Sequence, residues 1–115
     1  MDRINDITGK IKHFRDERDW LQFHDPKNMA VSIMLEAAEL LEHFQWKTKA
    51  EVEDYIKINR ESVQEEIADI SMYLFELADN LGIDLLLVME KKLKKNADKY
   101  PVAKAKGSHK KYDQL

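Results

Sequence analysis

The stretch that most constrains the fold of this chain runs from residue 28 to residue 46, where apolar residues lie on almost every side of a helix. They are Met29, Ala30, Val31, Ile33, Met34, Leu35, Ala37, Ala38, Leu40, Leu41 and Phe44. A helix that is apolar all round is buried. A chain of 115 residues has limited capacity to enclose it alone. We therefore predict that the chain forms a homodimer or homotetramer, in which subunit contacts complete the burial.

Three more long helices and one short helix are predicted around this one. The first carries Ile4, Ile7, Ile11 and Phe14 on one stripe, ends near Trp20, and is separated from the next by Asp25-Pro26. Thr48-Lys49-Ala50-Glu51 matches a capping box and opens the short helix. The third long helix carries Val63, Ile67, Ile70, Leu74, Leu77 and Leu81, and ends at Gly82. The fourth carries Leu85, Leu86, Val88, Met89 and Leu93 between Asp84, its predicted cap, and Pro101.

The short connections between these helices favour antiparallel neighbours. The predicted fold class is therefore all-α: an antiparallel four-helix-type bundle with an additional short helix, assembled as a dimer or a dimer of dimers. We place one domain at residues 1–101 and a basic C-terminal tail at residues 102–115. Four lysines against one aspartate give the tail a net charge of +3, whereas the rest of the chain carries −6.

Composition and charge exclude several classes of protein. The chain has no cysteine, which rules out disulfides and a Cys-ligated zinc site. Its first residues lack the apolar core of a signal peptide, and no run reaches membrane-spanning length, so we expect a cytoplasmic protein with no membrane partner. An acidic body does not bind nucleic acid by counterion release, so no nucleic-acid partner is expected.

Two pairs of carboxylates lie on or beside the apolar stripes of two predicted helices. Glu36 falls on the apolar line of the second helix, and Glu39 follows one turn later; Glu66 and Asp69 repeat this spacing on the third long helix. Acidic pairs are also common on solvated helix faces, and that interpretation stays open for Glu66 and Asp69. Four facing carboxylates would repel one another, become protonated, or bind cations. Oxygen ligands without histidine or cysteine suit Mg²⁺, Mn²⁺ or Ca²⁺ rather than zinc or copper, and we predict Mg²⁺, with Mn²⁺ as a possible substitute.

The two acidic pairs lie in the segments Glu36-Ala37-Ala38-Glu39 and Glu66-Ile67-Ala68-Asp69. This spacing resembles the paired acidic motif of the MazG-like, all-α nucleotide pyrophosphohydrolases. The dCTP pyrophosphatase-like branch is the most similar. The resemblance extends over most of the chain. It includes Glu17-Arg18-Asp19-Trp20, Gln22-Phe23-His24, Pro26-Lys27-Asn28, Phe44-Gln45-Trp46-Lys47, Lys99-Tyr100-Pro101-Val102 and Lys106-Gly107-Ser108.

The resemblance implies an Mg²⁺-dependent enzyme that cleaves a (deoxy)nucleoside triphosphate to the monophosphate and pyrophosphate. The substrate would be dCTP or a modified dCTP, in nucleotide-pool house-cleaning. By resemblance, the metal ligands and catalytic residues are Glu36, Glu39, Glu66 and Asp69. The residues that match nucleotide-binding positions are Trp20, His24, Trp46, Tyr73, Lys92 and Asn96.

Two departures from the family pattern concern the substrate. Lys99 stands where many members have arginine, and Ile11 and His13 occupy positions where base-contacting polar residues would be expected. Two alternatives therefore stay open: a broad-specificity pyrophosphatase for noncanonical nucleotides, and a non-catalytic helical interaction module whose acids bind a structural cation.

Overall fold

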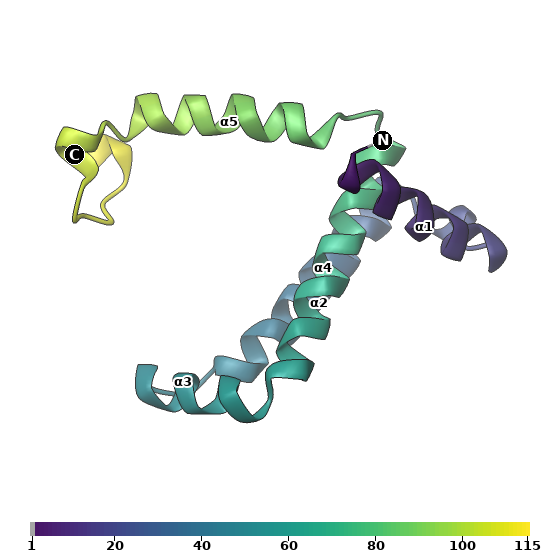
Figure 1. The fold of residues 1–115 in the computed structure, drawn as a ribbon, viewed down its shortest axis with the longest axis horizontal. Helices are drawn as coiled ribbons and strands as arrows, with labels where there is room; N and C mark the ends of the chain where they lie inside the picture. The colour runs from purple at the N-terminus through teal and green to yellow at the C-terminus, as the bar shows by residue number, and fades with distance from the viewer. Residues whose placement is uncertain (1) are drawn as a thin grey trace. The chain divides into compact units, whose positions relative to one another are not determined.

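The computed structural model describes residues 2–115, and every regular element in that range is helical. The chain divides into two compact units, one ending at Leu81 and the other running from Gly82 to Leu115. The first contains α1 (Arg3–Glu17), the 3-10 helix η1 (Leu21–Phe23), α2 (Pro26–Phe44), α3 (Lys49–Ile58) and α4 (Arg60–Asn80). The second contains α5 (Leu85–Lys99), α6 (Val102–Ala105) and the 3-10 helix η2 (Tyr112–Gln114). The all-α prediction is confirmed for residues 2–115 (Figure 1).

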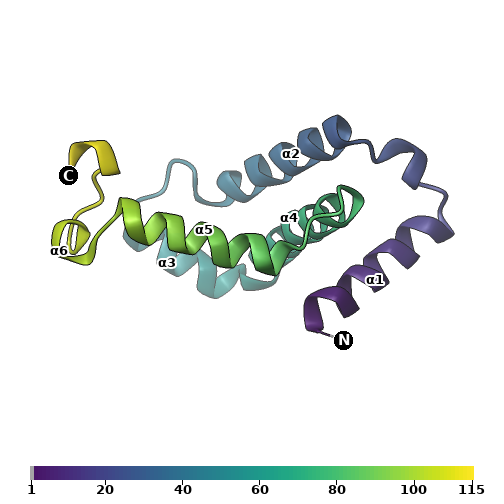
Figure 2. The ribbon, with the colours of Figure 1, turned by 90° about the horizontal axis from the view of Figure 1, so that it is seen from above.

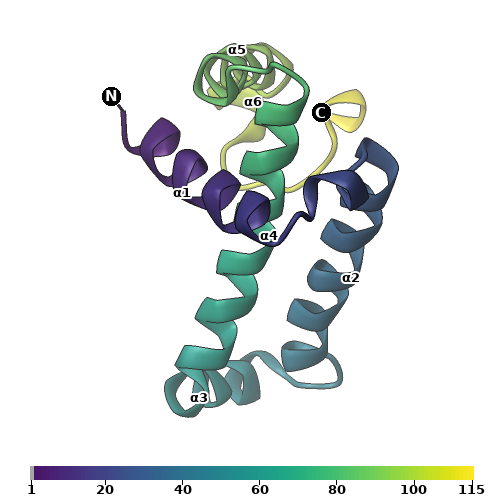
Figure 3. The ribbon, with the colours of Figure 1, turned by 90° about the vertical axis from the view of Figure 1, so that its right-hand side faces the viewer.

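Within the first unit, α4 is the central element. It packs against α2, α1 and α3. The short helix α3 reverses the chain, so α2 and α4 run antiparallel (Figure 3). The loop that contains η1 carries the chain from α1 to the start of α2 (Figure 2).

Helix ends follow the local signals in the sequence. The capping box is formed, since Thr48 and Glu51 each accept a hydrogen bond from the other's backbone N–H. Asp84 accepts from the backbone N–H of Leu87 at 3.2 Å and caps α5. Gly82 adopts φ +68°, the left-handed conformation expected beyond a helix end.

Two predicted helices have different bounds in the structure. The first helix ends at Glu17 rather than near Trp20, because Asp19 takes a left-handed φ of 54° and turns the chain. The second begins at Pro26 and ends at Phe44, rather than spanning 28–46. Its start is set by the side chain of Asp25, which accepts from the backbone N–H of Asn28 at 2.9 Å.

The expectation that the second helix is buried is not met within one chain. Met29 is the one fully buried residue of α2, whereas Met34 is 66% exposed and Leu35 is 57% exposed. The reason is that α4 is the main neighbour of α2 in the first unit and covers only one side of it. An exposed apolar surface of this kind is typical of a subunit interface. The formation of a dimer or tetramer stays a prediction. No helix within residues 2–115 combines the length and apolar character needed to cross a membrane.

Candidate active site

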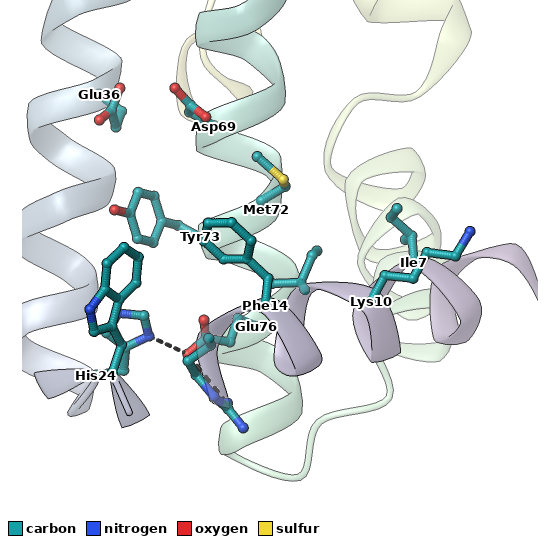
Figure 4. A pocket seen from close by; sticks show the side chains of 12 residues that line it. Ile7, Lys10, Phe14, His24, Glu36, Asp69, Met72, Tyr73 and Glu76 are labelled. Carbon is teal, nitrogen blue, oxygen red and sulfur yellow. Dashed lines mark hydrogen bonds and ion pairs between the residues drawn. The ribbon is translucent and has the colours of Figure 1, made fainter. Parts of the chain in front are cut away.

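The antiparallel packing of α2 and α4 brings the two acidic pairs together. Carboxylate oxygens of Glu36, Glu39 and Glu66 all lie within 4.8 Å of one another. Asp69 lies one turn after Glu66 and shares the wall of a pocket with Glu36. Figure 4 shows the carboxylates of Glu36 and Asp69 facing each other across the space between the two helices. Three of the four predicted ligands thus form one cluster, with the fourth beside it.

The carboxylates of the cluster lack partners that would balance their negative charge. The Oε2 atoms of Glu36 and Glu66 are buried, and neither has a hydrogen-bond partner among residues 2–115. Hydrogen bonding between the carboxyls of Glu39 and Glu66, and then the charge of Glu66, raise the pKa of Glu39. The pKa of Glu66 is raised as well, first by hydrogen bonding with Glu36 and then by desolvation. Carboxylates in such surroundings favour a proton or a cation, so the donor set fits a divalent ion that prefers oxygen ligands.

A pocket of about 450 Å³ opens next to this cluster, between α1, the η1 loop, α2 and α4. Glu36 and Asp69 lie on its wall, and most of the remaining wall is apolar or aromatic. The apolar and aromatic lining residues are Ile7, Ile11, Phe14, Trp20, Met72 and Tyr73. The rings of Trp20 and Phe14 pack in an edge-to-face arrangement, with centroids 5.7 Å apart. An apolar pocket beside convergent carboxylates is the form expected of a site for a small phosphorylated ligand with an aromatic part.

A second hollow, of about 340 Å³, includes the other acids of the cluster. Glu39 and Glu66 line it together with Glu42, His43 and Tyr55, and His43 Nδ1 lies 2.5 Å from the hydroxyl of Tyr55. The carboxylate cluster is therefore reached from two hollows, one mainly aromatic and one mainly polar.

Of the six residues predicted to contact nucleotide, three are brought together: Trp20, His24 and Tyr73 all line the larger pocket. Trp46 lines neither pocket; it follows α2, adopts a left-handed φ of 69°, and is 92% exposed. Lys92 and Asn96 lie on one face of α5, four residues apart, in the second unit. Roles for Trp46, Lys92 and Asn96 stay predictions.

Several residues of these pockets were not predicted from the sequence. Phe14 was assigned to the apolar stripe, and neither Arg15 nor Glu76 was singled out, although all three line the larger pocket. The spacing did contain a signal for Glu76, because Asp69, Tyr73 and Glu76 follow one another at helical steps on α4. No comparable signal identified Arg15, whose burial depends on how α1 crosses α4.

This chain is similar to a known protein family and to several known proteins. Residues 31–115, which include all four acids, match the pattern of the MazG-like family. Human dCTP pyrophosphatase 1 is 38% identical over 114 residues, covering 97% of this chain and 67% of the human protein. The rat dCTP pyrophosphatase 1 gives the same identity and coverage. The crystal structure of a pyrophosphatase from Archaeoglobus fulgidus superposes with a TM-score of 0.83 at 40% identity, covering 88% of this chain and 94% of that one. This chain belongs to the MazG-like family.

Proposed function

We propose that the protein is a nucleotide pyrophosphohydrolase, a hydrolase of acid anhydrides that cuts a (deoxy)nucleoside triphosphate into the monophosphate and pyrophosphate. The observation that carries this proposal is the juxtaposition of the Glu36, Glu39 and Glu66 carboxylates, within 4.8 Å of one another, with an aromatic-walled pocket of about 450 Å³. Family membership and the dCTP pyrophosphatase relatives support it.

In this proposal the four acids hold Mg²⁺, for which Mn²⁺ can substitute. The two buried oxygens without partners, Oε2 of Glu36 and Oε2 of Glu66, support a role as ligands, because unpaired buried acceptors are costly. When bound, Mg²⁺ supplies neutralisation of the triphosphate charge and a more acidic water. A carboxylate that is not fully engaged with the ion then takes the proton of the attacking water.

The larger pocket takes the nucleoside. The aromatic faces of Trp20 and Tyr73 stack the base, and His24 supplies a polar contact on the same wall. The four dCTP pyrophosphatase relatives favour dCTP or a modified dCTP as substrate, in nucleotide-pool house-cleaning. The apolar side chain of Ile11 on this wall favours the second candidate, a broader specificity for noncanonical triphosphates.

Assembly completes the site in this proposal. The protein is a cytoplasmic homodimer or homotetramer built as a four-helix-type bundle, and the exposed apolar residues of α2 lie at subunit contacts. Trp46, Lys92 and Asn96 contact the nucleotide in the assembled enzyme. Residues 1–101 form the catalytic domain, residues 102–115 form a basic tail, and neither nucleic acid nor membrane is a partner.

A thermal-shift experiment followed by a substrate panel tests the proposal. Mg²⁺ and a nucleoside triphosphate are expected to raise the melting temperature together by more than the sum of their separate effects, because the metal and the phosphates bind jointly. A helical cation-binding interaction module would respond to Mg²⁺ and ignore the nucleotide. Pyrophosphate release is then measured for triphosphates that differ in base and sugar, and no release from any of them would reject the proposal.

A further inference from the structure

One carboxylate in the larger pocket lies outside the acidic cluster and is deeply buried. Glu76, on α4, is 2% exposed and lies two turns beyond Asp69. An isolated buried carboxylate is costly, but Glu76 is well supplied with donors. Its Oε2 atom lies 2.7 Å from Nδ1 of His24 and accepts a hydrogen bond from Nδ2 of Asn80 at 3.0 Å. Nη1 of Arg15, itself 5% exposed, lies 3.5 Å from the same oxygen.

The contact with Glu76 determines which nitrogen of His24 carries the proton. A carboxylate oxygen that already has two other donors around it acts as an acceptor, so the Nδ1 atom of His24 must be the donor. The contact thereby selects one tautomer and fixes the plane of the ring. Nε2 of His24 is the remaining polar atom, and no partner for it is present among residues 2–115. Figure 4 shows His24 between Glu76 and the side of the pocket that holds Tyr73.

Glu76 is itself held in place from a second helix. Arg15, on α1, donates from Nε to Asp16 at 2.8 Å and from Nη1 to the side-chain oxygen of Asn80 at 3.1 Å. His24, in contrast, follows η1 in a connecting segment. The network thus connects a residue of a connecting segment to two packed helices, which restricts its side chain before any ligand arrives.

We propose that Glu76 is a positioning residue, which holds His24 with Nδ1 protonated and Nε2 free for a polar group of the nucleotide. The proposal rests on the proposed function only in taking the pocket ligand to be a nucleotide. It assigns to Glu76, which Arg15 contacts, a role separate from that of the four acids. Preorganisation of this kind acts on binding, so its loss changes KM more than kcat.

The experiment combines a tautomer measurement with a double-mutant cycle. The variants are Glu76→Met, which removes the acceptor and keeps a similar length, His24→Ala, and the double variant. The matched control is Asp79→Asn, which removes another contact between α1 and α4, the 3.0 Å ion pair of Asp79 with Lys12, outside the pocket. Correlation of the ¹⁵N and ring ¹H signals of His24 in ligand-free protein reports the tautomer, and steady-state kinetics reports KM and kcat.

In the parent protein we expect the Nδ1–H tautomer, and Glu76→Met abolishes this preference. KM rises about tenfold in Glu76→Met and in His24→Ala, with kcat changed less than about threefold, as expected for one charge-assisted hydrogen bond. The double variant has the KM of His24→Ala, because Glu76 acts through His24. Asp79→Asn keeps the parent tautomer and the parent KM.

Two results would overturn the proposal: an Nε2–H tautomer in the parent protein, or effects of the two substitutions on KM that multiply. If Glu76→Met fails to melt cooperatively, Glu76→Gln takes its place in the cycle. Its uncharged amide oxygen is a weaker acceptor for Nδ1, so KM rises less, and this rise is still absent when His24 is already alanine. If no triphosphate is cleaved at all, the proposed function fails on that ground, whereas the tautomer in ligand-free protein still decides whether Glu76 holds His24.

Discussion

The substitution Glu36→Gln tests the acidic cluster, because it should lower activity and raise the stability of the metal-free protein. Glu36 belongs both to the carboxylate cluster and to the wall of the larger pocket, and its buried Oε2 has no partner among residues 2–115. An amide keeps the shape of the side chain and removes its charge. Activity should fall at least about 100-fold at saturating Mg²⁺, because a ligand to the ion is lost. Without metal, the same change should stabilise the protein, because it removes repulsion among like charges.

The size of the stabilisation follows from the geometry. Two unit charges at the 4.8 Å limit of the cluster repel by about 1 kcal/mol in water and by about 3 kcal/mol at an effective dielectric of 20. The cluster borders two open pockets, so we take the lower value. For a domain of this size it corresponds to a rise of about 4 °C in the melting temperature.

The assay is calorimetry in EDTA together with pyrophosphate release at saturating Mg²⁺. The matched control is Glu65→Gln, which removes an exposed acid next to the cluster and should leave activity and melting temperature almost unchanged. The reasoning is refuted if Glu36→Gln retains activity, or if it lowers the melting temperature of the metal-free protein as an ordinary loss of a structural side chain would.

Three further predictions concern pH, base stacking and assembly. The pKa values of Glu39 and Glu66 are raised in the folded, metal-free protein, so their contribution to stability is present at low pH and is lost as the pH rises through the folded-state values. The melting temperature in EDTA should therefore fall as the pH rises above 4.5, the ordinary glutamate pKa, and Mg²⁺ affinity, measured by titration calorimetry, should rise with pH in the same way. Trp20→Ala should raise KM about tenfold with little change in kcat, the loss expected when a stacking face is removed; an unchanged KM would exclude base stacking on Trp20. Light scattering at micromolar concentration should give a dimer or tetramer, and Leu35→Lys, on the exposed apolar side of α2, should shift it towards monomer; a monomeric parent protein would contradict the assembly.

Several local features of the fold were predicted from short sequence signals. The capping box at Thr48, the cap at Asp84 and the left-handed Gly82 were all predicted, because each depends on interactions within a few residues. The end of α1 was placed too late, because the left-handed conformation of Asp19 is not apparent from the apolar spacing. The spacing within each helix predicted which acids share a face, whereas the convergence of Glu36, Glu39 and Glu66 across two helices was expected from the family resemblance.

The parts of the site that the sequence did not reveal depend on contacts between distant elements. Arg15 is a charged residue on a helix with several others, and its burial follows from the crossing of α1 over α4 near Glu76. His24 could be proposed only by resemblance, because the residue that fixes its ring lies 52 positions away. Trp46 is a similar case, since it follows α2, is almost fully exposed, and was proposed only by resemblance.

The central claim is that the acids of α2 and α4 support cleavage between the α and β phosphates. The most direct test is to incubate the protein with Mg²⁺ and a triphosphate substrate and to separate the first-formed nucleotide by chromatography, with no coupling enzyme. The predicted products are the nucleoside monophosphate and pyrophosphate, formed only when metal is present, with Ca²⁺ a poor substitute because of its looser coordination geometry. A nucleoside diphosphate with orthophosphate as the first products would contradict the account.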